Sequence, residues 1–185
     1  MKIKYLFNKF FSSKGFTAFN SHERGFTLIE LLIVIAILGV LAAGVLVAID
    51  PVEQLARGRD SGRKSAVTQL GRALQAYYTA NSNYPAIAGW NTTLINSGEI
   101  KVFPSNPAGV TAPCTGGNVV NEYCYKTNAT PDVVVYTRME SKVEQRKGTC
   151  GGVAANTWYV YSSADGKSGL LCQAGEPAAG VTGLL

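Results

Sequence analysis

Apolar and polar residues divide the chain into segments that differ in pattern. Residues 1–25 are basic with scattered aromatic side chains, and residues 31–49 contain no charged or strongly polar side chain. Together with Phe26–Ile29, this apolar run is long enough to cross a bilayer as a helix. No second run of this kind occurs later in the sequence. The pattern therefore predicts one membrane span or signal, at residues 26–49, followed by a single head.

A helical pattern continues beyond the apolar run, but on one face only. Apolar residues recur there at the three- and four-residue spacing of a helix face: Leu55, Ala66, Leu70, Ala73, Leu74 and Tyr77. We therefore expect one long helix over residues 26–81. Asp50-Pro51 predicts a kink or short break in it, because proline removes a backbone donor and clashes with the preceding turn. Asn81–Pro85 predicts the helix end.

The remaining residues, 82–185, predict a small antiparallel sheet after a long loop. Residues 81–121 are rich in Gly, Pro, Asn, Ser and Thr, which is typical of a loop with little regular structure. Strand patterns occur at 122–129, 132–140 and 156–164, and a hairpin turn at 164–167 leads into a last strand at 168–173. The expected fold class is α+β, with the amphipathic half of the helix covering one face of a four-stranded antiparallel sheet.

Charge separates the N-terminal residues from the rest of the chain. The net charge is +5, of which residues 1–25 hold +4 and residues 26–185 only +1. The near-neutral remainder shows no specific nucleic-acid site. Lys and Arg beside a first span stay in the cytoplasm. We therefore expect residues 1–25 to be a cytoplasmic leader and the head to lie outside.

The amphipathic half of the helix carries a cluster of charges and several glycines. The charged residues are Arg57, Arg59, Arg63, Lys64, Asp50, Glu53 and Asp60. Because the signs balance, we expect a solvated, mutually paired face rather than a ligand site. Gly58, Gly62 and Gly71 are expected to loosen the helix, since glycine disfavours a helix interior.

All cysteines lie in the head: Cys114, Cys124, Cys150 and Cys172. An even number in an oxidising compartment predicts two disulfides. Three pairings are possible, and we favour the nearest-neighbour one, Cys114 with Cys124 and Cys150 with Cys172. The alternative of reduced or metal-binding thiols has neither a C-x-x-C spacing nor a histidine in the head to support it.

The sequence offers little for catalysis. His22 is the only histidine and lies in the leader, so the head cannot hold a Ser-His-Asp or Cys-His arrangement. Asp165–Gly169 superficially matches part of a phosphate loop, but the required upstream glycine is replaced by Tyr161. We expect no enzyme activity, no cofactor and no metal site.

Glu30 is the residue that needs an explanation, because a carboxylate inside an apolar run is costly. An ordinary secretory signal cleaved near Leu41–Gly44 has no use for an acid in its apolar core. A plain anchor with a snorkelling or protonated acid is another alternative. The stretch GFTLIELLIVIAILG, residues 25–39, resembles the class III signal of type IV pilins and pseudopilins, and residues 70–85 are similar to the later helical segment in that superfamily.

The resemblance implies how the N-terminus is processed and used. A prepilin peptidase of the inner membrane would cut between Gly25 and Phe26 and methylate the new Phe26 amine. Glu30 of an incoming subunit would pair with the Phe26 amine of a neighbour and fix their axial stagger. The 26–49 helices would then form the filament core.

The implied function is that of a structural subunit of a type IV pilus-like filament. Its partners would be copies of itself, other pilins, the prepilin peptidase, and an assembly platform with its ATPase. The head would lie outside the inner membrane before joining a periplasmic or extracellular filament. A minor pilin, or a pseudopilin of type II secretion or DNA uptake, shares the same N-terminus and is the alternative. A membrane-anchored binding domain and an ordinary secreted enzyme belong to other classes.

Overall fold

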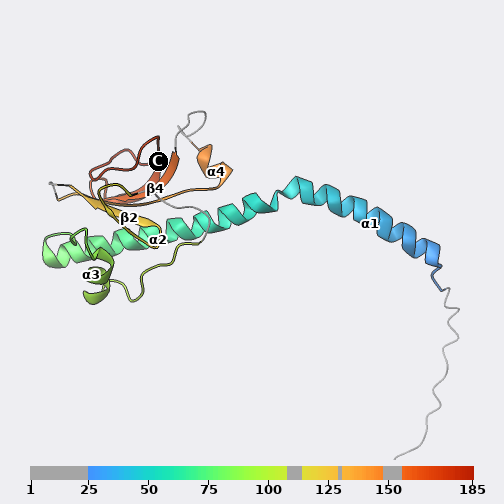
Figure 1. The fold of residues 1–185 in the computed structure, drawn as a ribbon, viewed down its shortest axis with the longest axis horizontal. Helices are drawn as coiled ribbons and strands as arrows, with labels where there is room; N and C mark the ends of the chain where they lie inside the picture. Colours follow the sequence, from blue (N-terminus) through green and yellow to red (C-terminus); the bar gives the residue numbers. More distant parts are fainter. Residues whose placement is uncertain (1–24, 108–113, 129–130, 148–155) are drawn as a thin grey trace, which may run out of the picture. The chain divides into compact units, whose positions relative to one another are not determined.

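The computed structural model describes residues 25–107, 114–128, 131–147 and 156–185 (Figure 1). These residues form two compact units, one up to Val45 and one from Leu46 onward. The first unit is helical, and the second contains a helix, a sheet and their connections.

Helix α1, Leu28–Ile49, is exposed on every side. Apolar residues surround its axis, so no face is distinguished for packing against a core. Within the described residues, one helical stretch is long and apolar enough to cross a membrane: Leu28–Asn81, with a mean hydropathy of 3.1 in a window that is 0% buried. An apolar surface of this extent requires lipid or other protein around it.

Helix α2, Pro51–Asn81, begins after a break at Asp50, as the Asp50-Pro51 pair predicts. Asp50 adopts a left-handed conformation with φ 44°. Pro51 then occupies the first turn of α2, where a missing N–H costs little. The helix ends at Asn81 as predicted, but Ser82 takes the left-handed position, and its N–H donates to Tyr78 O at 2.7 Å.

The sheet has five antiparallel strands in sequential order, rather than the four expected. They are β1 Asn118–Val120, β2 Tyr123–Thr127, β3 Val133–Arg138, β4 Asn156–Ser162 and β5 Lys167–Gln173. The additional strand, β1, is only three residues long and pairs at the edge through Val119 opposite Cys124. Strands this short have no readable alternation, which is why residues 118–120 could not be separated from the loop before them.

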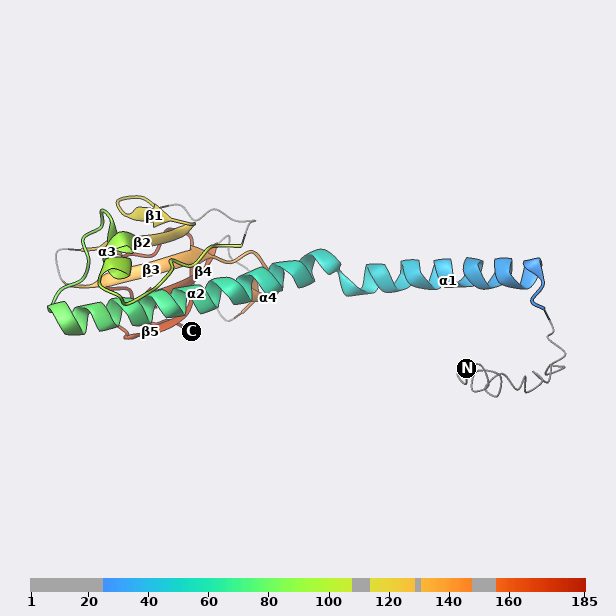
Figure 2. The same cartoon turned by 90° about the horizontal axis from the view of Figure 1, so that it is seen from below.

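Two short helices complete the second unit: α3, Trp90–Asn96, and α4, Lys142–Gln145. The segment predicted as a loop therefore contains α3, which is held in place by its buried residues Trp90 and Leu94. Figure 2 shows α2 running along the sheet, with α3 near the end where α2 stops and α4 near the end where α2 starts.

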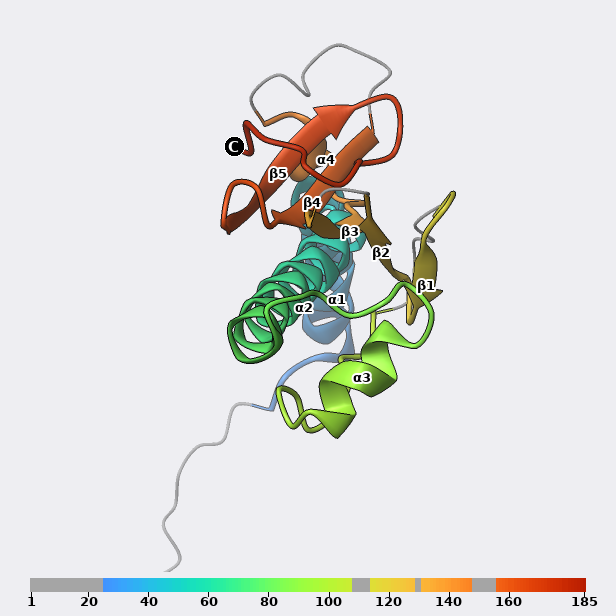
Figure 3. The ribbon, with the colours of Figure 1, turned by 90° about the vertical axis from the view of Figure 1, so that its left-hand side faces the viewer.

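Both faces of the sheet are covered, and α2 covers one of them (Figure 3). Val67, Leu70 and Leu74 of α2 pack with Trp90, Tyr125 and Val135 in one buried cluster. On the other face, Val134, Tyr136 and Trp158 pack with Leu184 from the C-terminal segment. Alternate residues of β3 thus enter opposite cores, which explains why nearly the whole strand is buried.

Two expectations for α2 are wrong. Leu55 is 63% exposed and takes no part in the core, because the buried face of the first turns carries Glu53, Ala56 and Asp60 instead. Gly71 is not a place where the helix is weakened. A Cβ there would lie 2.3 Å from Cδ2 of Tyr161, so glycine is what allows the Tyr161 ring to lie against the helix backbone.

Candidate functional site

The start of α1 holds Glu30 in a local hydrogen-bonding arrangement. Glu30 Oε2 accepts from the Thr27 N–H and from the Thr27 hydroxyl, each at 2.8 Å. In return, the Glu30 N–H donates to Thr27 Oγ1 at 3.3 Å. This reciprocal pattern is a capping box, in which threonine and glutamate three residues apart satisfy free N–H groups at a helix start. The T-x-x-E spacing, Thr27 to Glu30, is visible in the sequence but was not among the predictions made from it.

The capping box gives the acid a role before any partner is present. A carboxylate in the first turn is also favoured by the positive end of the helix dipole. A carboxylate offers about four acceptor positions, so Glu30 keeps acceptor capacity beyond its two bonds to Thr27. The same group can therefore cap its own helix and accept from a cation.

The Gly25–Phe26 bond lies outside the helix. Residues 25–27 are non-helical, and the Phe26 side chain is 81% exposed. Gly25 has no heavy atom within 4 Å of the position where a Cβ would lie. The chain around this bond is thus non-helical and exposed.

The exposed surface of α1 combines large apolar side chains with small residues. Leu31, Leu32, Ile33 and Ile35 are exposed, and Gly39 and Gly44 have open space around them. Small residues allow helices to approach each other closely, and large ones fill the space between them. The helix can therefore pack against other helices on any side.

Asp50 lies between α1 and α2 and caps α2. Asp50 Oδ1 accepts from the Glu53 N–H at 3.3 Å and so caps α2, while Asp50 Oδ2 lies 3.3 Å from Lys142 Nζ of α4. The Glu53 N–H, followed by Lys142, lowers the pKa of Asp50. An ion pair between Asp50 and Lys142 thus joins the left-handed turn to the head.

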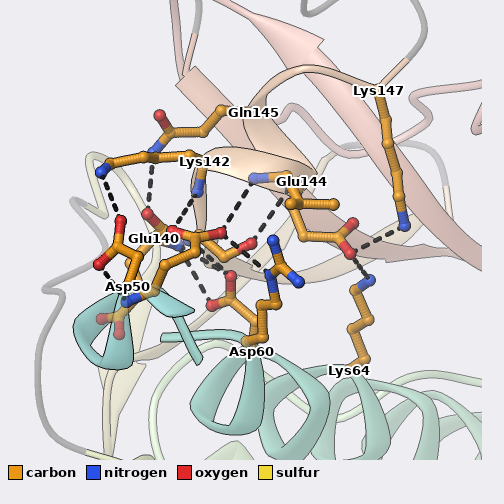
Figure 4. A network of polar contacts seen from close by, with 12 residues as sticks. Asp50, Asp60, Lys64, Glu140, Lys142, Glu144, Gln145 and Lys147 are labelled. Carbon is orange, nitrogen blue, oxygen red and sulfur yellow. Dashed lines mark hydrogen bonds and ion pairs between the residues drawn. The ribbon is translucent and has the colours of Figure 1, made fainter. Parts of the chain in front are cut away.

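Three charged residues that were expected on a solvated face, Glu53, Asp60 and Arg63, are buried. Asp60 lies in a network of polar contacts between α2 and the segment of α4 (Figure 4). Asp60 is 1% exposed and Arg63 is 0% exposed. Arg63 Nη1 donates to Asp60 Oδ1 at 2.8 Å, and its other nitrogens donate to Asn106 Oδ1 at 2.9 Å and Pro107 O at 3.0 Å. The expected pairing is present, but the expectation of solvation is wrong for this pair, because residues 106–107 and the segment after β3 lie against it.

Carboxylates of α2 also bind the backbone of the segment that carries α4. Asp60 Oδ2 accepts from the Ser141 N–H at 2.8 Å and from the Glu140 N–H at 3.2 Å. Glu53 accepts from the Lys142 and Val143 N–H groups at 3.1 and 3.3 Å. Burial alone would raise the pKa of Glu53, but these two N–H groups and Arg57 lower it. Two acids one heptad apart on α2 thus position α4.

A second polar cluster holds the C-terminal segment on the sheet beside a disulfide. Cys114 and Cys124 are bonded, one of the two pairs favoured from the sequence, with Cα atoms 5.6 Å apart. Glu176 accepts from the Thr115 N–H at 2.8 Å, from Lys126 Nζ at 2.5 Å and from the Tyr136 hydroxyl at 2.9 Å. Burial opposes ionisation of Glu176, but the bonds from Lys126, Thr115 and Tyr136 lower its pKa to about 2.

The other favoured pair, Cys150 with Cys172, includes a residue outside the described part of the chain. Among the described cysteines none is free. The residues that the structure describes contain no group of three His, Cys, Asp or Glu side chains able to hold a metal ion. A shallow groove of about 690 Å³ lies along α2, but charges of both signs line it, Lys64, Arg72 and Glu99, and so it indicates no single ligand chemistry.

Comparison with known proteins identifies the N-terminal segment. Residues 20–46 match the family described as the prokaryotic N-terminal methylation motif. The chain is also 39% identical over 116 residues to the fimbrial protein of Neisseria meningitidis serogroup B. Both similarities support a type IV pilin. No solved structure matches it.

The similarity to the fimbrial protein is partial in length. It covers 56% of this chain and 62% of the meningococcal protein, so the chain spans less than two thirds of that relative. The matched motif includes Gly25, Phe26 and Glu30, which the structure places together at the exposed start of α1. The α+β architecture, a long N-terminal helical region with an antiparallel sheet, is the one that the resemblance implies.

Proposed function

We propose that the chain is a prepilin whose mature form is a structural subunit of a type IV pilus-like filament. The observation that supports this most is an N-terminal methylation motif joined to an exposed apolar helix that carries a single acid, Glu30, in its first turn. In this proposal the chain is cut between Gly25 and Phe26, and the new Phe26 amine is methylated.

Cleavage changes the charge at the start of the helix. In the uncut chain the Phe26 nitrogen is a neutral amide, whereas after the cut it is a cation. Glu30 lies four residues away, about 6 Å along a helix axis. The Phe26 amine of one subunit and Glu30 of another then form an ion pair in surroundings of low dielectric. An unpaired carboxylate there is heavily penalised and a paired one is largely compensated, so the pair selects one axial stagger.

Assembly removes the apolar surface of α1 from lipid and places it against neighbouring helices. Residues 26–49 form the membrane span before assembly and the filament core afterwards. The head lies outside the inner membrane, since the basic leader stays in the cytoplasm. The partners are other copies of the chain and other pilins, the prepilin peptidase, and an assembly platform with its ATPase.

The head supplies the surface of the filament. Residues 86–121 and the region from Cys150 to Cys172 are the segments that we propose to set its specificity. A minor pilin, or a pseudopilin of type II secretion or DNA uptake, would share every feature of the N-terminus described above. A major subunit should dominate filaments sheared from cells, and a minor one should be scarce there.

The processing step is tested by mass spectrometry of the mature protein. The proposal predicts a chain that begins at Phe26 with a mass increase of one methyl group on that residue. A chain that retains Met1, or an unmethylated chain that begins after Ala43, would show instead a plain anchor or an ordinary signal.

A further inference from the structure

Positive charge gathers at one end of the head. Residues 26–185 carry a net +1 in all, yet the charges around α4 and the start of α2 sum to +3. We call this cluster the neck surface; its cations are Arg57, Arg59, Arg63, Lys64, Arg138, Lys142, Arg146 and Lys147. Its acids are Asp50, Glu53, Asp60, Glu140 and Glu144. The rest of residues 26–185 is therefore net negative.

The acids of the neck surface are already engaged within the head. Asp60 faces the buried Arg63, and Glu53 binds the N–H groups at the start of α4. Glu140 contacts Arg59 and Arg63. Glu144 Oε1 lies 2.7 Å from Lys64 Nζ and 2.8 Å from Lys147 Nζ. The excess charge is therefore cationic.

The exposed cations lie on and beside α4. The Lys142 and Lys147 side chains are 66% and 49% exposed. Arg146 is exposed, and no ion pair joins it to another described residue. Val143, 37% exposed, adds an apolar side chain between them. The surface thus combines long cationic side chains with an apolar contact.

The position of α4 is fixed relative to the end of the apolar segment. Lys142 Nζ lies 3.3 Å from Asp50 Oδ2, and Asp50 directly follows Ile49, the last residue of α1. Leu46–Ile49 belong to the same compact unit as the head. Figure 4 shows Lys142, Glu144 and Lys147 above the first turns of α2. Because Asp50 directly follows the apolar segment in the chain, Lys142 lies beside the residue at which we propose that the chain leaves the hydrocarbon.

We propose that α4 and the exposed cations of the neck surface dock onto anionic phospholipid headgroups of the bilayer that holds residues 26–49 before assembly. This inference rests on the membrane span proposed above. A Lys or Arg near an anionic membrane surface strengthens binding by about fivefold, and the effect is screened by salt. Docking would hold the head close to the membrane until the subunit leaves the bilayer.

The test uses the full chain in lipid nanodiscs, either of neutral phosphatidylcholine or with about one third of the lipid replaced by anionic phosphatidylglycerol. Lysines are acetylated for short times, and the rate at each lysine is measured by mass spectrometry. Lys101 and Lys167 are exposed and lie outside the neck surface, so they serve as internal references. Docking predicts that Lys142 and Lys147 react about fivefold more slowly in anionic discs than in neutral ones, while the reference lysines do not change.

Two matched variants separate docking from general electrostatics. Arg146→Gln removes an exposed cation of the neck surface, and Arg72→Gln removes an exposed cation elsewhere on α2. The Arg146→Gln change should restore most of the Lys147 acetylation rate in anionic discs, as should high salt. The Arg72→Gln change should leave the slowing as it is in the unaltered chain.

Equal rates for Lys142 and Lys147 in both lipids would overturn the docking proposal, as would equal effects of the two variants. Copurification of the chain with the discs reports the membrane span separately. A chain that is embedded but shows no lipid-dependent rates refutes docking alone, whereas a chain that does not embed refutes the span and docking together.

Discussion

Replacing Asp60 by alanine removes the acid at the centre of the contact between α2 and the α4 segment. Asp60 is buried and accepts from Arg63, Glu140 N and Ser141 N. The variant leaves two backbone N–H groups without their acceptor and deprives a buried guanidinium of one partner. The substitution therefore creates an unsatisfied, charged site inside the head.

The expected loss of stability is about 3–4 kcal/mol. Breaking a buried ion pair from one side costs about 3–5 kcal/mol, and a buried N–H without an acceptor costs about 1–3 kcal/mol. The lower part of this range applies, because Arg63 keeps Asn106, Pro107 and Glu140 as partners. For a domain of this size the change lowers the melting temperature by about 10 °C.

Urea denaturation of the detergent-solubilised chain measures this loss. Trp90 and Trp158 lie in the two cores of the head, so their fluorescence reports its unfolding. Arg57→Ala is the control, because Arg57 is 46% exposed and its partner Glu53 keeps the Lys142 and Val143 N–H groups. Surface pairs contribute less than about 1 kcal/mol. A stability for Asp60→Ala within about 0.5 kcal/mol of the parent chain, or equal losses in both variants, would refute the reasoning.

Two further substitutions test the head. Gly71→Ala should destabilise the head by about 1–2 kcal/mol in the same denaturation assay, because the new Cβ overlaps the Tyr161 ring. Gly58→Ala is the control: Gly58 has open space around it, so the change should stabilise the head by up to about 1 kcal/mol. Equal effects of the two substitutions would contradict the close approach of Tyr161 as the cause. Glu176 has a pKa lowered from 4.5 to about 2, so its ionised form contributes stability above pH 4.5 that is lost as the pH falls toward 2. Glu176→Gln should therefore cost about 2 kcal/mol at pH 7 and almost nothing at pH 2 in thermal unfolding experiments, and a difference that does not depend on pH would contradict this assignment.

The strongly periodic parts of the structure could be predicted from the sequence. The apolar run and the stripe containing Leu70 and Leu74 each have one clear period, and the Asp50-Pro51 break and the helix end at Asn81 result from backbone chemistry. Strands β2 to β5 have enough length to show β-branched and aromatic enrichment.

The parts that could not be predicted depend on what covers a residue. Asp60 and Arg63 have the sequence pattern of a solvated helix face, but Asn106, Pro107 and the segment after β3, about 80 residues away from Asp60, contact them in the fold and they are buried. Likewise Gly71 resembles a helix weakness until Tyr161 is placed against it. The Thr27–Glu30 capping box, in contrast, does not depend on what covers it. Its T-x-x-E spacing is visible in the sequence and could have been predicted from it.

Glu30 has two roles in this account, and one substitution separates them. Glutamine can replace glutamate in a capping box, so Glu30→Gln keeps the bonds with Thr27 but removes the negative charge. Thr27→Val does the reverse, since it keeps the charge and removes the hydroxyl. Membrane insertion and N-terminal processing of both variants, measured by mass spectrometry, serve as controls.

The most direct test of the central claim is the amount of filament sheared from cells that express Glu30→Gln. If the carboxylate sets the register by pairing with the Phe26 amine of a neighbour, this variant is inserted, cut and methylated but gives few or no filaments, while Thr27→Val still assembles. Normal filament yield from Glu30→Gln would contradict the account and leave Glu30 as a helix cap alone.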